Sequence, residues 1–352
     1  MKINRENLRT AMTMLQMATS KDKNKPFATS LIELSTHEGY LYGYTYNTRI
    51  HLRYKICPVS EEFTTTVAFD FLDGLLKSSD CDEIDLTKDL DKNGAEFVRF
   101  RSSTLNCKMP TYDNTVAHVK TGKKDAVKTV VTNEDFTTYC DMNMIKKVLN
   151  QHSQVACYQN IYFGDVVMVT DGHLAVIAKK RIFNDDVLLN YKTVEILTKL
   201  GDFEYTIEKD ANFNISHLYV TTSDIAMYVI TEDTTRYQAQ DLMTLFTKNI
   251  PDMVTLERSN VSSCISASSL FPTESMVLTF NELGVFVCIA TYDFKYRLSE
   301  TPCTTKKSYK INIDILKKLL IHDIINMYYG EDRMLQVKGS IFEEVIGCES
   351  VG

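Results

Sequence analysis

Glycine and proline are scarce in this sequence, which has 13 glycines and 6 prolines among 352 residues. Long linkers and disordered segments are usually rich in these residues, so their scarcity argues against such segments. No apolar run approaches the roughly 20 residues that a helix needs to cross a bilayer. The first residues, Met1–Glu6, are charged and lead into a helix-like segment, which is not the pattern of a signal peptide. These absences predict a globular chain of about two or three domains.

The nine cysteines are scattered singly along the chain. No Cys-x-x-Cys pair and no Cys/His cluster has the spacing of a metal site. The pattern predicts reduced thiols in a cytoplasm, with no bound metal or other cofactor. The sequence also has no glycine-rich nucleotide-binding loop and no nucleophile elbow, which argues against two common classes of enzyme.

The formal net charge of the chain is −7 at pH 7. An acidic total argues against nucleic-acid binding only if the charge is evenly spread, because a protein can combine a cationic face with an acidic surface elsewhere. The net charge therefore leaves nucleic-acid binding open.

Two turns in the middle of the chain, Gly164-Asp165 and Asp171-Gly172, each separate strongly apolar segments. This pattern predicts two successive β-hairpins. At the second turn, Asp171 could bond its own backbone while His173 packs against a neighbour. Alternatively, the two side chains could act as an acid/base pair. No motif places a nucleophile nearby, which favours the turn interpretation.

Hydrophobic periodicity predicts one order of elements three times along the chain: strand, helix, strands, helix and strands. Helices are expected at 5–19, 69–78, 141–152, 191–200, 262–271 and 314–322. Asp135–Tyr139 is expected to be the strand that opens the second repeat. The pattern predicts an α+β fold with antiparallel sheets. We expect three domains, covering residues 1–118, 119–246 and 247–352.

The segment Thr170-Asp171-Gly172-His173, which follows a hairpin and precedes Leu174-Ala175-Val176, resembles the middle domain of the bacterial DNA polymerase III β sliding clamp family. The repeated element order extends this resemblance from Met1 to about Val345. The resemblance implies three clamp domains per chain, with antiparallel sheets outside and helices lining a ring. It implies a processivity factor without catalysis that encircles double-stranded DNA as a head-to-tail homodimer. The replicative DNA polymerase and a clamp loader would be its partners, with no membrane involved.

The resemblance also implies roles for particular residues. Cations on the inner helices would attract phosphates without contacting bases, so that the ring can slide. The residues expected to face DNA are Arg9, Lys25, Lys146, Lys147, Tyr158, Lys192, Lys199, Lys317 and Lys318, although each cation could simply be a solvated helix residue. A pocket for short partner peptides is expected to contain Thr170, Gly172, His173, Leu174, Leu242 and Met243. Leu270 and Phe271 are expected either at the dimer contact or in an ordinary core.

Departures from the family pattern concentrate at this pocket. The Arg that usually lies between His173 and Leu174 is missing, and Gln238 and Leu242 stand where a Pro and an Arg are usual. The chain also ends in 347–352 without the Met-Pro-Met type of tail that walls the pocket in the family. We therefore expect a divergent member of the family whose peptide preference differs.

Two other functions remain open from the sequence. A scaffold of three repeats could bind protein partners without ever holding DNA. An enzyme could use Asp171 and His173 as its acid and base, but no supporting motif accompanies them. Reversing the charge of the helix lysines would separate a clamp from a scaffold, because only the clamp needs them.

Overall fold

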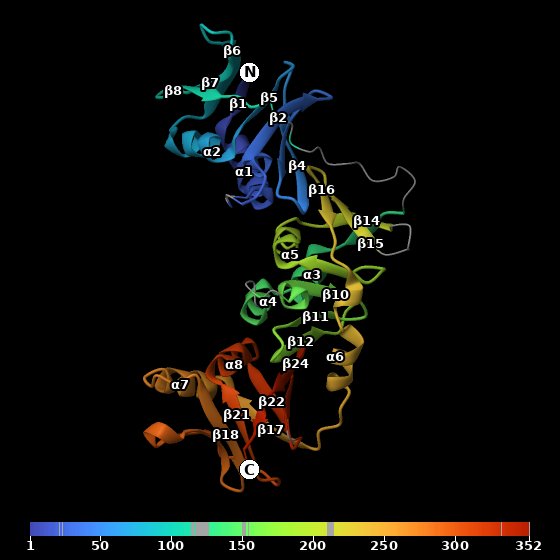
Figure 1. Ribbon diagram of the computed structural model, residues 1–352, viewed down its shortest axis with the longest axis vertical. Coiled ribbons are helices and arrows are strands. Elements are labelled where there is room, and N and C mark those ends of the chain that lie inside the picture. Colours follow the sequence, from blue (N-terminus) through green and yellow to red (C-terminus); the bar gives the residue numbers. More distant parts are fainter. Residues whose placement is uncertain are drawn as a thin grey trace. The chain divides into compact units, whose positions relative to one another are not determined.

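Figure 1 shows a computed structural model of the chain. The structure describes residues 1–20, 22, 24–113, 116, 127–149, 153, 155–209, 215–331 and 333–351. Two compact units are present, the first formed by Met1–Asn133 with Glu195–Glu232 and the second by Glu134–Val194 with Asp233–Gly352. Within the described ranges, no helix is both long enough and apolar enough to cross a membrane.

The first unit contains two antiparallel sheets. The smaller sheet has four strands in the order β1 (Lys2–Asn4), β6 (Glu83–Leu90), β7 (Glu96–Arg101) and β8 (Asn106–Pro110). The larger sheet has eight strands in the order β5 (Thr64–Ala68), β2 (Leu31–His37), β3 (Tyr40–Tyr46), β4 (Ile50–Pro58), β16 (Ile225–Ile230), β15 (Ile215–Thr221), β14 (Phe203–Lys209) and β9 (Thr129–Val131). Strands β4 and β16 therefore join segments that lie far apart in the sequence.

Two helices pack on the sheets of the first unit. Helix α1 (Arg5–Leu15) begins at Asn4, whose side-chain oxygen accepts hydrogen bonds from the backbone N–H groups of Glu6 and Asn7. Its buried residues recur at three- and four-residue steps and face β3 and β4: Leu8, Ala11, Met12 and Leu15. Helix α2 (Phe69–Ser78) packs against α1 and β5. Short 3₁₀ turns occupy Gln16–Ala18 and Phe27–Ser30.

The second unit also contains two antiparallel sheets. Its eight-stranded sheet has the order β13 (Val187–Asn190), β10 (Asn160–Phe163), β11 (Val167–Thr170), β12 (Leu174–Ala178), β24 (Phe342–Gly347), β23 (Met334–Lys338), β22 (Ile324–Tyr329) and β17 (Asp252–Glu257). Its five-stranded sheet has the order β20 (Phe294–Ser299), β19 (Gly284–Ile289), β18 (Ser275–Asn281), β21 (Lys307–Asn312) and β25 (Glu349–Ser350). The pairing of β12 with β24 again joins distant segments.

The remaining helices are short. They are α3 (Asn133–Tyr139), α4 (Met142–Val148), α5 (Tyr191–Leu197), α6 (Ala239–Phe246), α7 (Arg258–Ser268) and α8 (Ile313–Lys318), with 3₁₀ turns at Ala156–Gln159, Thr234–Arg236, Ala290–Tyr292 and Leu319–Ile321. In the second unit, α8 contacts both α4 and α7, and α4 also contacts β11 and β12. This packing brings α8 close to the strands that carry the Asp171-Gly172 turn.

The predicted α+β class and the predicted hairpins are confirmed. Strands β10 and β11 pair across Gly164-Asp165, and β11 and β12 pair across Asp171-Gly172. All six predicted helices are present. Helix α2 has the predicted ends, the other five have shifted ends, and the last residues of the one expected at 141–152 lie outside the described residues. The three-domain division stays a prediction.

The strand predicted at Asp135–Tyr139 is wrong, because this segment is helix α3. The strand of this region is β9, a few residues earlier. Phe136 and Cys140 are both buried, and their four-residue spacing fits a helix. Acidic residues in the first turn, Glu134 and Asp135, also favour a helix N-terminus. A short segment with an isolated phenylalanine fits the period of a strand and that of a helix equally well, so the pattern alone does not identify the helix.

Candidate functional site

The turn between β11 and β12 is held by its own side chains. Asp171 Oδ1 accepts hydrogen bonds from the backbone N–H groups of His173 (2.9 Å) and Leu174 (2.8 Å). The Thr170 hydroxyl donates to the Leu174 carbonyl oxygen at 2.9 Å and accepts from the Gly172 N–H at 3.1 Å. Asp and Thr are residues that satisfy turn backbone in this way. The Thr-Asp-Gly sequence therefore builds a rigid turn.

Gly172 meets two local requirements of this turn. Its φ is +91°, in the left-handed region that side chains with a Cβ rarely adopt. A Cβ at this position would also clash with the hydroxyl oxygen of Tyr158. Glycine thus permits both the backbone conformation and the close approach of the tyrosine.

Lys318, the last residue of α8, stabilises the turn through an ion pair with Asp171. Its Nζ donates to Asp171 Oδ2 at 2.6 Å, and both side chains are largely buried, with exposed fractions of 17% and 16%. Burial alone would raise the pKa of Asp171, but hydrogen bonds from Lys318, Leu174 and His173 outweigh it and lower the pKa. Asp171 is therefore an ionised anchor with both oxygens engaged, which favours the turn role over acid/base chemistry.

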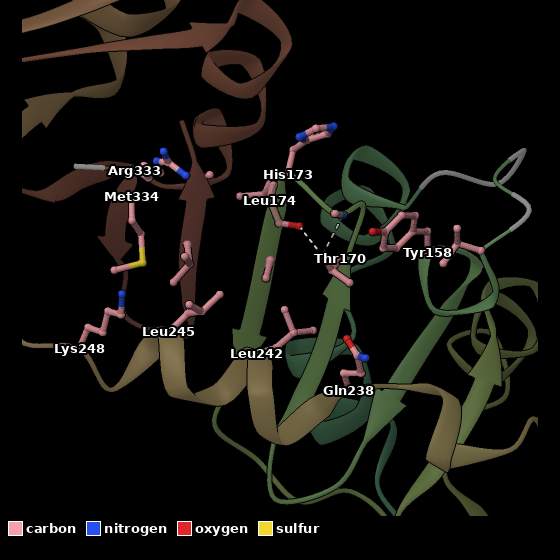
Figure 2. A pocket seen from close by; sticks show the side chains of 15 residues that line it. Tyr158, Thr170, His173, Leu174, Gln238, Leu242, Leu245, Lys248, Arg333 and Met334 are labelled. Atoms are coloured by element: carbon pink, nitrogen blue, oxygen red, sulfur yellow. Dashed lines mark hydrogen bonds between the residues drawn. The ribbon is translucent and has the colours of Figure 1, made fainter. Parts of the chain in front are cut away.

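A cavity of about 500 Å³ opens beside this turn. Its walls come from the β11–β12 turn, from α6 and the residues next to it, and from β23 and β24 (Figure 2). The lining residues are Val155, Tyr158, Thr170, Gly172, His173, Leu174, Ala175, Gln238, Leu242, Leu245, Lys248, Arg333, Met334, Val345 and Gly347. A concave, largely preformed site with apolar walls and a few polar groups is what small or peptide ligands usually occupy.

Helix α6 places apolar side chains on this cavity. Gln238, Leu242 and Leu245 recur at steps of four and three residues, so they share one face of the segment. Met243 lies off this face and packs against the buried cluster behind the cavity, which includes Met168, Phe246 and other core residues. The apolar wall is thus continuous with the core of the second unit.

The structure brings together most of the residues predicted for the pocket. Thr170, Gly172, His173, Leu174 and Leu242 line the cavity, whereas Met243 does not. Tyr158, which the sequence placed at DNA, lies in the same lining. Sequence reasoning missed Val155, Ala175, Leu245, Lys248, Arg333, Met334, Val345 and Gly347. The helical spacing around Leu242 could have indicated Leu245, but the strand residues depend on tertiary pairing.

The C-terminal segment contributes to one wall of the cavity. Strand β24 ends at Gly347, which lines the cavity and pairs with Met334 on β23. The Cys348 N–H then donates to the Arg333 carbonyl oxygen at 3.0 Å, and β25 turns away to pair with β21. Met334 lines the cavity from the neighbouring strand β23 and supplies a flexible apolar side chain.

The cations predicted to face DNA are mostly exposed. The exposed side chains are those of Arg9, Lys25, Lys146, Lys147, Lys192, Lys199 and Lys317. Lys317 pairs with Asp314 at 2.7 Å, three residues before it on α8. Lys318 is the exception, because its charge is neutralised by the buried pair with Asp171. Among the described residues, no group of three or more His, Cys, Asp or Glu side chains is placed to hold a metal ion.

The residues predicted for a dimer contact lie just after α7. Leu270 is 80% exposed. Phe271 is half-buried and packs against Tyr292 and Phe294, with ring centroids 4.9 and 5.1 Å away. Tyr292 is 41% exposed, so Leu270 is the more exposed of these two apolar side chains.

No family model matches the sequence, and no curated protein matches it. Solved structures do match the fold along nearly the whole chain. A DNA polymerase III β chain from Streptococcus pneumoniae has a TM-score of 0.82 at 11% identity, covering 99% of this chain and 98% of that one. A β subunit from Borrelia burgdorferi has a TM-score of 0.81 at 14% identity, covering 100% and 99%.

A Helicobacter pylori β clamp bound to a DNA ligase peptide has a TM-score of 0.79 at 15% identity, covering 99% of each chain. Identities this low carry the architecture and not the individual site residues. The chain therefore has the fold of the bacterial β sliding clamp.

Proposed function

We propose that this chain is a divergent sliding clamp, a processivity factor that encircles double-stranded DNA as a head-to-tail homodimer and tethers the replicative polymerase. The observation that carries the proposal is the likeness of the fold to bacterial β clamps over 99–100% of the chain. A likeness that covered one domain would leave the assembly undefined. A likeness that covers whole chains on both sides supports the three-domain division at 1–118, 119–246 and 247–352.

The proposal assigns the exposed helix cations to DNA. Lys146 and Lys147 on α4 and Lys317 on α8 would attract phosphates through water and mobile ions, without fixed contacts to bases. Such contacts hold DNA without trapping the protein at one sequence. Arg9, Lys25, Lys192 and Lys199 would do the same from other elements. Lys318 has a different part, because its pair with Asp171 supports the pocket.

The cavity beside the β11–β12 turn would bind short linear segments of the polymerase, of a clamp loader and of other partners. Its apolar walls are formed by Leu174, Leu242, Leu245 and Met334, which suit the apolar anchors of a short peptide. The peptide-bound Helicobacter pylori clamp supports this use of the fold. Leu270 and its aromatic neighbours would contribute to the dimer contact. The protein would have no catalysis of its own and would act in the cytoplasm, where the DNA lies.

Retention on circular DNA tests this function. With a bacterial clamp loader present, the protein should stay on nicked circular DNA through gel filtration and leave when the circle is cut. Enclosure predicts both results, whereas ordinary affinity predicts equal binding to circles and linear DNA. A scaffold that never holds DNA would not be retained on either form.

Charge reversal gives a matched test of the inner cations. Replacing Lys146, Lys147 and Lys317 with Glu should abolish retention on circles. A control with Lys2, Lys92 and Lys306 replaced by Glu changes the net charge equally at other exposed positions and should be retained. Equal retention of both triple variants would contradict the assignment of these residues to DNA.

A further inference from the structure

We propose that the pocket beside the β11–β12 turn selects peptides with a carboxylate next to their apolar anchors, and that Lys248 and Arg333 bind this carboxylate. The inference rests on the proposed partner pocket and specifies its ligand. It concerns two cations of this chain that the sequence did not single out.

The charge of the pocket lining is one-sided. The titratable residues among the described lining of the cavity are His173, Lys248, Arg333 and Tyr158, and none of these described lining residues is an Asp or Glu. The chain as a whole has more acidic than basic residues, 46 Asp and Glu against 39 Lys and Arg. The cavity therefore has a charge opposite to that of the chain. A ligand of complementary charge would bind faster and more selectively there.

The two cations are not used within the chain. Both side chains are exposed, and within the part of the chain that the structure describes neither has a hydrogen-bond or ion-pair partner. Lys318, close to the same turn, is instead neutralised by Asp171. Arg333 can bind a carboxylate with two parallel hydrogen bonds, and Lys248 can add a point charge. The pocket thus offers an anionic group two cations that have no partner among the described residues.

The cations occupy one end of the pocket. In Figure 2, Lys248 and Arg333 lie on the same side, next to Met334, whereas Tyr158 lies at the opposite side. Leu242 and Leu245 lie between these ends. A bound peptide would place its apolar anchors on the leucines and its carboxylate at the Met334 end. Leu242 and Leu245 are uncharged, so neither adds a competing cation between the two ends.

The carboxylate is the side chain of an Asp or Glu that follows the apolar anchors. The α-carboxylate of a chain terminus presents the same planar anion, and it is the alternative source that the experiment distinguishes.

Fluorescence anisotropy with synthetic peptides tests the proposal. The probes share two leucines and a phenylalanine in a Gly/Ser background and differ in their charge. One is amidated and neutral, one is amidated with an Asp after the anchors, and one is neutral in sequence with a free C-terminus. We expect the Asp peptide to bind about three- to tenfold more tightly than the neutral one, with the advantage reduced by salt. An advantage seen only for the free-acid peptide would contradict the assignment to an acidic side chain.

Variants connect this preference to the two cations. The double variant Lys248→Met and Arg333→Met should bind all three peptides with the affinity of the neutral one. Lys306→Met, another exposed lysine of the second unit, is the matched control and should keep the preference. A charge-reversing Arg333→Glu variant should prefer a peptide with Lys in place of Asp.

The outcomes separate this inference from the proposed pocket. Equal binding of all peptides by the wild-type protein overturns the carboxylate preference and leaves the apolar pocket standing. A preference that survives in the double variant also overturns it, because other residues would then be responsible. If no probe binds, not even at millimolar concentration, the proposed pocket fails together with the inference.

Discussion

Replacing Lys318 with Met should destabilise the turn that shapes the pocket. The variant keeps most of the side-chain length and removes only the ammonium group. Asp171 then stays largely buried with two backbone hydrogen bonds but without its counter-ion. Breaking a fully buried pair costs about 3–5 kcal/mol, and an exposed pair contributes at most about 1 kcal/mol. With exposed fractions of 17% and 16%, we expect a loss of about 2–3 kcal/mol at neutral pH.

The adjacent lysine is a matched control. Lys317 pairs with Asp314 within the same helix, but the two side chains are 51% and 64% exposed. Lys317→Met should therefore change the free energy of unfolding by no more than about 0.5 kcal/mol. Urea denaturation followed by circular dichroism measures both variants under one set of conditions. The difference between neighbouring lysines isolates the effect of the buried partner.

The stabilisation that Lys318 gives should depend on pH, and the lowered pKa of Asp171 determines the direction of this dependence. The pKa of Asp171 is lowered in the folded protein, so its ionised form stabilises the fold above the unfolded pKa of about 3.9. This contribution is lost as the pH falls through the lowered folded pKa. The gap between wild type and Lys318→Met should therefore be full at neutral pH and shrink in acid.

A double-mutant cycle with Asp171→Asn completes the test. Lys318→Met should cost less in the Asp171→Asn background, because no buried carboxylate remains to be neutralised. Peptide binding should weaken in Lys318→Met and stay unchanged in Lys317→Met, since only the first supports the pocket. Equal costs for the two lysine variants, or no coupling in the cycle, would refute the reasoning.

Three further predictions concern Gly172, Glu344 and Leu270. Gly172→Ala should lower the free energy of unfolding by about 1–3 kcal/mol and weaken peptide binding, because φ is +91° and Tyr158 fills the space. Gly74→Ala in α2 places its Cβ where no atom lies within 4 Å, so it should raise the free energy of unfolding by about 0.5–1 kcal/mol. Urea denaturation measures both variants. Burial raises the pKa of Glu344 although His322 and Lys318 oppose it. The free energy of unfolding should therefore fall as the pH rises from about 4 through the raised pKa of Glu344. Glu344→Gln should remove this fall in a series of unfolding measurements at different pH values. Leu270→Glu should shift the proposed dimer toward monomer in analytical ultracentrifugation, whereas Leu283→Glu, which replaces a leucine that is 61% exposed, should not.

Local patterns predicted the parts of the site that are formed locally. The Asp171-Gly172 turn and its two strands could be read from one segment, because the turn residues and the apolar residues act within a few positions. Helix α1 was equally readable from its three- and four-residue spacing. The prediction of a strand at α3 was wrong because a short stretch with one buried aromatic residue does not distinguish a strand from a turn of helix.

Long-range packing produced the parts that the sequence did not predict. Lys318 meets Asp171 across 147 positions in the chain. Met334 and Val345 reach the cavity because β24 pairs with β12, which no local pattern records. Lys248 and Arg333 likewise looked like ordinary surface cations until the fold brought them to one cavity.

Electron microscopy of the purified protein tests the central claim most directly, because it requires neither a loader nor a known partner. The account predicts particles with the outline of a closed ring and a central opening wide enough for duplex DNA, made of two copies of the chain. Particles that are open, or single chains that never close at micromolar concentration, would contradict it.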